Sequence, residues 1–139
     1  MEPKEYLRQI ELLDTKINQL IREKDAAASL YGVSGTDYSR ERVQSSPLAS
    51  APFTRAVHKK IMLEAEIDRL IDKYVDLKRL IISQIQQLDD VRFTKLLYAR
   101  YVEFKRLDTI AAEMNYTYAH IKRVHGWALS AFGQKFLKF

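Results

Sequence analysis

The residues best suited to chemistry lie close together near the carboxyl end of the chain, at the start of an expected helix. They are Thr117, Tyr118, Ala119, His120, Lys122 and Arg123. Cationic and hydroxyl donors of this kind contact phosphate oxygens and the edges of bases in double-stranded DNA. Lys105 and Arg106, a little earlier in the chain, extend the basic set, and no acidic residue follows Glu113. The residue types therefore indicate binding of a polyanion.

The elements that must position these residues follow a recognisable order. A short helix is expected over residues 107–114, a turn over residues 115–117, and a basic helix capped by Thr117. Ala111 is small where the two helices must approach closely. The basic helix carries an inward apolar stripe at helical spacing, formed by Ile121, Val124, Ala128 and Phe132. A short helix, a tight turn and a basic helix together are typical of the helix-turn-helix motif.

Residues for catalysis or metal binding do not form any comparable pattern. The three histidines (His58, His120 and His125) share no metal-ligand spacing with carboxylates, and the chain has no cysteine. No glycine-rich phosphate loop, nucleophile elbow or acid–base pair is visible. We therefore expect a protein that is not an enzyme, with no cofactor and no metal site.

The fold expected from the composition is all-α. The 139 residues include only 4 Gly and 3 Pro, which suits long helices. Heptad-spaced apolar residues predict one helix over residues 3–31 and a second helix that begins near Phe53 or Thr54 and ends at Leu88. Thr54 is the candidate N-cap of the second helix. Residues 32–52 are rich in Ser, Gly and Pro and are expected to form a mobile loop. Two long helices joined by one loop predict an antiparallel hairpin, a coiled coil.

The second long helix carries more apolar residues than one seam needs. The expected hairpin seam consists of Leu63, Ile67, Leu70, Tyr74, Leu77, Ile81 and Leu88. A separate stripe consists of Ile71, Val75, Ile82 and Ile85. A two-helix seam buries little beyond its own positions, so this stripe needs another partner. We expect a second protomer, giving a homodimer, and the alternative cover is the C-terminal segment.

The rest of the chain reads as a small separate domain. Asp89 and Asp90 predict a new helix start, with the helix running to about residue 102. Residues 89–139 hold nine Lys/Arg against five Asp/Glu, most of the net charge of +5. The expected domains are therefore a hairpin over residues 1–88, for oligomerisation, and a DNA-binding domain over residues 89–139. Three aromatic residues are expected in the core of the small domain: Tyr98, Tyr101 and Trp127.

A run of residues in the C-terminal segment follows a known pattern: Arg100-Tyr101-Val102-Glu103, Leu107, Ile110-Ala111, Met114, Thr117, Ile121 and Ala128-Leu129. This run resembles region four of bacterial sigma factors, which reads the −35 promoter element. Three further stretches extend the likeness: Leu12 to Asp14, Arg42 to Ser46, and Glu66 to Asp72. With them, the chain is similar to phage late-transcription regulators of the RinA/ArpU kind.

Four positions depart from the family pattern. The pattern has Gly where this chain has Phe104 and Asn115, and it has a capping Ser where this chain has Arg106. A basic residue, which would contact a phosphate, is common in the pattern where this chain has Trp127. Asn tolerates the left-handed backbone conformation that a helix end often needs.

The resemblance implies a phage-encoded transcriptional regulator, a late-gene activator that binds double-stranded DNA, with contact to host RNA polymerase left open. One alternative is a DNA-packaging protein of the small-terminase type. Another is a coiled-coil adaptor without a DNA role. No apolar run approaches ~18 residues, so no membrane span is expected, and the expected location is the cytoplasm of the bacterial host.

Overall fold

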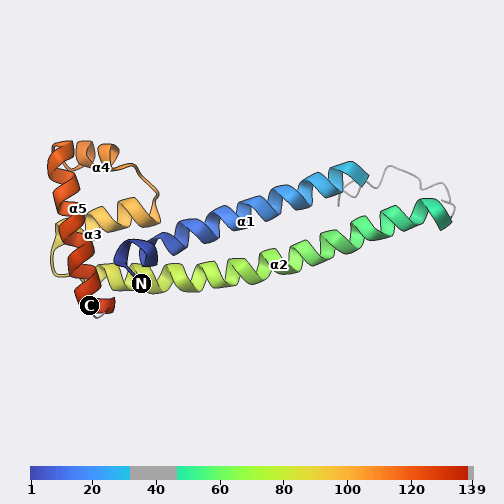
Figure 1. Cartoon of the computed structure of the whole chain (residues 1–139), viewed down its shortest axis with the longest axis horizontal. Coiled ribbons are helices and arrows are strands. Elements are labelled where there is room, and N and C mark those ends of the chain that lie inside the picture. Colours follow the sequence, from blue (N-terminus) through green and yellow to red (C-terminus); the bar gives the residue numbers. More distant parts are fainter. Residues whose placement is uncertain (32–46, 138–139) are drawn as a thin grey trace. The chain divides into compact units, whose positions relative to one another are not determined.

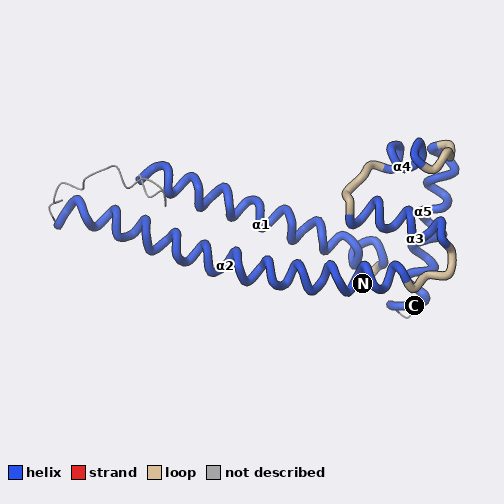
Figure 2. The backbone as a smooth tube through the Cα atoms, turned by 180° about the vertical axis from the view of Figure 1, so that it is seen from behind, coloured by secondary structure: helices blue, strands red, loops and turns tan. Residues whose placement is uncertain are grey.

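The computed structural model describes residues 1–31 and 47–137, and its regular structure within these ranges is entirely helical (Figures 1 and 2). The expectation of an all-α chain is confirmed. The elements, in chain order, are α1 (Pro3–Tyr31), α2 (Pro47–Gln86), α3 (Val91–Leu97), the π-helical turn η1 (Tyr98–Val102), α4 (Leu107–Glu113), α5 (Tyr118–Phe132) and the π-helical turn η2 (Gly133–Leu137).

The first long helix has the predicted bounds, whereas the second begins earlier than expected. Helix α2 starts at Pro47, so Thr54 lies inside the helix and the prediction that it is the N-cap is wrong. The physical reason is local: proline has a backbone angle suited to the first helical position, and alanines follow it. Of the expected loop over residues 32–52, residues 32–46 lie outside the described residues, and residues 47–52 are helical.

The start of α3 confirms the expected helix boundary. The Asp90 carboxylate accepts a hydrogen bond from the backbone N–H of Arg92 (2.9 Å) and also pairs with the Arg92 guanidinium. These hydrogen bonds, the one from the guanidinium above all, lower the pKa of Asp90. The cap explains why a new helix begins at Val91, five residues after the last residue of α2.

The chain divides into two compact units, and the division differs from the expected boundary at residue 88. One unit, called here the terminal unit, comprises Met1–Asp14 and Lys73–Phe139. The other, the middle unit, comprises Thr15–Asp72. The reason is packing: the last turns of α2 and the first turns of α1 bury their apolar faces against the C-terminal helices. Residues 89–139 therefore share their core with both long helices.

Within the middle unit, α1 and α2 run in opposite directions. Lys59 pairs with Glu23 (3.6 Å), and a shallow hollow between the helices is lined by Ala26, Ala27 and Ala56, among others. Among the residues of this unit whose burial is described, the buried side chains are Ile17, Ala56, Ile67 and Leu70. Ile67 and Leu70 belong to the expected seam, and their burial is consistent with the predicted hairpin spacing.

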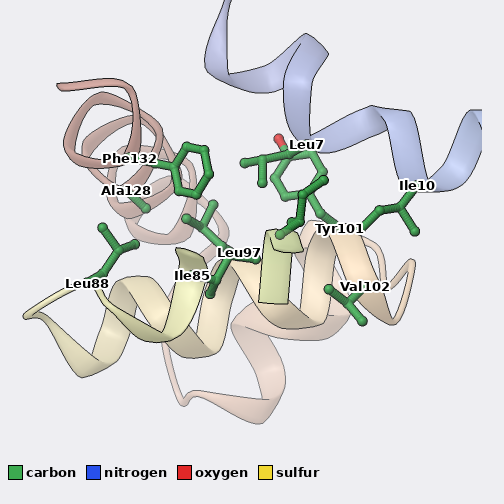
Figure 3. Close-up of a cluster of buried hydrophobic side chains, with 10 residues drawn as sticks. Leu7, Ile10, Ile85, Leu88, Leu97, Tyr101, Val102, Ala128 and Phe132 are labelled. Carbon is green, nitrogen blue, oxygen red and sulfur yellow. The ribbon is translucent and has the colours of Figure 1, made fainter. Parts of the chain in front are cut away.

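The main core of the terminal unit draws on every helix except α4. Its buried members are Leu7, Ile10, Ile81, Ile85, Leu88, Leu97, Tyr101, Val102, Ala128 and Phe132. Figure 3 shows side chains from α1, α2, α3, η1 and α5 converging on this cluster. At its edge the hydroxyl of Tyr6 donates a hydrogen bond to Gln84 (2.8 Å), and the Tyr6 ring packs against Phe132.

A second core holds α4 in place. It consists of Leu96, Ala99, Ile110, Ala111, Ile121 and Val124, all buried. Ala111 is 3% exposed, as expected for a small residue at a close approach of helices. Because α3 and α4 have only seven residues each, they depend on this packing for stability.

The apolar stripe assigned to a second protomer is partly used inside the chain. Ile85 is completely buried in the main core, and the half-buried Ile82 packs against it. The prediction that Ile85 belongs to an oligomerisation surface is therefore wrong, because the C-terminal helices cover it, whereas Ile82 is covered only in part. Ile71 (39% exposed) and Val75 (38% exposed) remain accessible.

A polar contact lies at the border of the main core. The hydroxyl oxygen of Tyr101 and the Nε2 atom of His125 are 2.7 Å apart. The two atoms lie within hydrogen-bonding distance, and burial raises the pKa of Tyr101 to about 12, so its hydroxyl keeps its proton. Burial, together with the cations Arg100, Lys4 and Arg8, lowers the pKa of His125 to about 4.

The burial pattern predicts unequal effects of truncating the two ends of the stripe. Ile85→Ala leaves a cavity in the main core and should lower the free energy of unfolding by about 2–5 kcal/mol. Ile71→Ala truncates a partly exposed side chain and should lower the free energy of unfolding by less than about 1 kcal/mol. Urea unfolding of both variants measures the difference. Equal losses would contradict the assignment of Ile85 to an intramolecular core.

The His125 contact predicts a loss of stability in mild acid. The unfolded chain binds a proton near the ordinary pKa of 6.5, whereas the folded chain resists protonation until about pH 4. The contribution is complete above pH 6.5 and is lost as the pH falls from 6.5 to about 4. We expect the free energy of unfolding to fall by about 1–2 kcal/mol over this range. This is less than the full pKa difference would give, because the His125 ring is only half-buried and solvent weakens the effect. His125→Gln should remove this component from urea unfolding measured at several pH values, and an unchanged profile would contradict it.

Candidate nucleic-acid interface

The interface expected from the sequence is built on the first turns of α5. Thr117 has an extended backbone, and its hydroxyl oxygen accepts a hydrogen bond from the N–H of His120 (3.1 Å). The expected N-cap is therefore confirmed. The cap fixes where the helix begins, and hence which side chains point away from the core.

Helix α5 has one buried face and one exposed face. Ile121, Val124, Ala128 and Phe132 are 0% exposed, as the apolar stripe predicts. The opposite side carries the exposed residues Tyr118, Ala119, Lys122, Arg123 and Gly126, with Thr117 exposed just before them. A methyl group added at Gly126 would meet no atom within 4 Å, so the backbone is open there. Small residues and cations thus share one accessible surface.

The two cations on this surface are available to an external anion. Lys122 and Arg123 form no ion pair within the described part of the chain. The Lys122 ammonium lies 4.5 Å from the centre of the Tyr118 ring, one turn earlier on the helix. Such an exposed cation–π contact contributes about 0.5–1 kcal/mol, which orients the lysine without neutralising its charge.

An aromatic row that the sequence did not predict runs from the turn before α5 along that helix. The His120 ring lies edge-on to Tyr116 (4.7 Å between centres) and to Trp127 (6.3 Å). Trp127 is 49% exposed and Tyr98 is 36% exposed, so the prediction that both belong to the core is wrong; Tyr101 is buried as expected. The buried stripe already fills the face of α5 that meets the core. The 4 and 7 residue spacings of Tyr116, His120 and Trp127 are the signal that could have revealed the row.

Lys105 and Arg106 occupy different surroundings from the α5 cations. The Lys105 ammonium donates to both carboxylate oxygens of Glu113 (3.1 Å) and lies 3.8 Å from Glu103. The hydrogen bond that Lys105 donates to Glu113 is the main cause of the raised pKa of Lys105. Arg106 pairs with Asp108 (3.3 Å) but is otherwise exposed. Lys105 thus links the end of η1 to the end of α4, and Arg106 lies before α4 with no side-chain cap of that helix.

The turn between α4 and α5 is closed by backbone hydrogen bonds. Asn115 has φ 59°, the left-handed conformation expected for it. The N–H of Tyr116 donates to Ala111 (2.8 Å) and that of Asn115 to Ala112 (3.3 Å), which is the Schellman arrangement of a helix end. This closure sets the direction in which α5 leaves α4.

The turn before α4 repeats this conformation at a bulky residue. Phe104 also has φ 59°, and Phe104 and Asn115 are the non-glycine residues with positive φ in the described ranges. A left-handed conformation costs an ordinary residue roughly 1–2 kcal/mol, whereas glycine adopts it without strain. The Phe104 side chain is partly exposed and belongs to neither core.

Other classes of site gain no support from the geometry. Among residues 1–31 and 47–137, no three His, Asp or Glu side chains are grouped so that they could hold a metal ion. In the same ranges no helix has the length and apolar character needed to cross a membrane. Comparisons of the chain with protein-family models, curated proteins and solved structures find no match.

The strained turn predicts opposite effects of two substitutions at one position. Phe104→Gly relieves the left-handed strain and should raise the free energy of unfolding by about 0.5–1 kcal/mol. Phe104→Ala keeps the strained backbone conformation and removes the aromatic ring, and it should therefore lower the free energy of unfolding. Thermal or urea unfolding of both variants gives the comparison. If both variants are equally destabilised, the ring contributes more than its backbone conformation costs, and the account of this turn fails.

Proposed function

We propose that this chain is a phage-encoded transcriptional regulator, an activator of late genes, that binds double-stranded DNA through α5. The observation that carries the proposal is the exposed face of that helix, where Lys122 and Arg123 lie unpaired beside small residues. In this arrangement α4, the closed turn and α5 act as a helix-turn-helix, with α5 as the recognition helix in the major groove.

Each exposed residue has a distinct part in this proposal. Lys122 and Arg123 contact phosphate oxygens or guanine edges, and Thr117 and Tyr118 offer hydroxyl groups near the helix start. Ala119 lets the helix approach the bases closely. His120 is held against Tyr116 and Trp127, which fixes its ring at the margin of the interface. Arg106 adds a peripheral phosphate contact. Lys105 is paired with Glu113, so its main role is to hold the end of η1 against the end of α4.

The backbone of the two turns also supports the proposal. The resembled pattern has glycine at the positions of Phe104 and Asn115, and both residues have the left-handed conformation that glycine adopts easily. It has a capping serine at the position of Arg106, which lies directly before α4 with an extended backbone. A chain that keeps the backbone of a motif while changing these side chains fits descent from that motif.

Removing the two α5 cations provides the test. Lys122→Ala with Arg123→Ala should weaken binding to duplex DNA and reduce the slope of log K against log salt by about two, roughly one per phosphate contact. Fluorescence anisotropy with a labelled duplex at several salt concentrations measures both quantities. Lys16→Ala with Arg22→Ala, which removes two exposed cations from α1, is the matched control and should change the slope little.

The possible outcomes separate the proposed function from its alternatives. An unchanged affinity and slope in the α5 variant would show that DNA is not bound by this helix. Absence of any salt-dependent binding by the unaltered protein would favour an adaptor role without DNA. Binding accompanied by a ring of many protomers would favour a packaging protein.

A further inference from the structure

An open groove lies between α1 and α2 within the terminal unit, away from the α5 surface. Its volume is about 510 Å³, and it is lined mainly by the half-buried Leu13 and Leu77 and the exposed Leu12 and Leu80. Leu12 is 66% exposed and Leu80 is 50% exposed. Two large apolar side chains left in water beside an apolar hollow are a feature of interaction surfaces.

We propose that a second copy of this chain docks in this groove, so that the protein is a two-fold symmetric dimer through α1 and α2. In a two-fold interface the same surface is used twice, and it must therefore contain both the projecting groups and the hollow that receives them. The groove meets this condition because Leu12 and Leu80 project next to the space above Leu13 and Leu77. The Leu12 and Leu80 side chains of one subunit then fill the hollow above Leu13 and Leu77 of the other subunit, in the knobs-into-holes manner of packed helices.

The charges at the groove point to the same partner. Lys73 and Asp76 are exposed, lie one turn apart on α2, and form no ion pair within the described residues. A two-fold axis that passes between Lys73 and Asp76 pairs Lys73 of one subunit with Asp76 of the partner subunit. The same axis pairs Asp76 with Lys73 of the partner subunit. This rim has no net charge, which disfavours nucleic acid or an anionic membrane as the occupant.

This interface is a different surface from the Ile71, Val75, Ile82 and Ile85 stripe. Ile82 and Ile85 pack within the chain, whereas Leu12 and Leu80 have no such cover. The dimer would join the two subunits through their long helices and leave both α5 surfaces accessible, because no α5 residue lines the groove. Dimerisation through this groove does not require DNA binding.

The mass of the full chain in solution tests the proposal. Sedimentation velocity at about 1–100 µM should give twice the 16.3 kDa of one chain for the unaltered protein. Leu12→Asp with Leu80→Asp should raise the dimer dissociation constant at least about a hundred-fold and give monomers. Both side chains are exposed, so the helical circular dichroism signal should remain. Ile71→Asp with Val75→Asp, and separately Val91→Asp at another exposed apolar position, are controls that should stay dimeric.

A charge exchange tests the register of the interface independently. Lys73→Asp places two carboxylates opposite each other and should dissociate the dimer, and adding Asp76→Lys should restore it. A protein that is monomeric at about 100 µM, or a dimer that survives the two leucine changes, would overturn the proposal. The proposal would also be overturned if the Lys73→Asp, Asp76→Lys double variant stayed monomeric. It would likewise be overturned if Ile71→Asp with Val75→Asp dissociated the dimer.

Discussion

The terminal unit depends on one shared apolar contact, in which the end of α2 buries Ile81 and Ile85 against the C-terminal helices. Phe132 of α5 and Leu97 of α3 close this contact, and Leu7 and Ile10 cover it from α1. Helices of seven residues, such as α3 and α4, are marginal in isolation. The long helices thus provide the support on which the short ones assemble.

The same packing determines what the protein presents to its surroundings. Because α5 commits one face to the core, its Lys122 and Arg123 face must remain outside. Hydrogen bonds then refine the orientation: Thr117 fixes the start of α5, and the left-handed Asn115 closes the preceding turn. The backbone strain at Phe104 is tolerated because the contacts on either side determine the path of the chain, with the N–H of Lys105 bonded to Ala99.

Features set by local sequence could be predicted, whereas features set by tertiary partners could not. The bounds of α1, the Thr117 cap and the conformation of Asn115 follow from periodicity and from side-chain chemistry within a few residues. Periodicity also revealed that Ile85 lies on an apolar face, but not that α5 covers it. For the same reason the sequence wrongly predicts Trp127 in the core, although the buried stripe of α5 is complete without it.

Photo-crosslinking tests the central claim, that α5 contacts double-stranded DNA, most directly. Benzoylphenylalanine in place of Tyr118, an exposed residue at the start of α5, should crosslink to duplex DNA at low salt, and the crosslink should fade as salt rises. The same probe in place of the exposed Ile61 of α2 should give little crosslink. Equal crosslinking from both positions, or none from position 118 while the protein still binds DNA, would contradict the account.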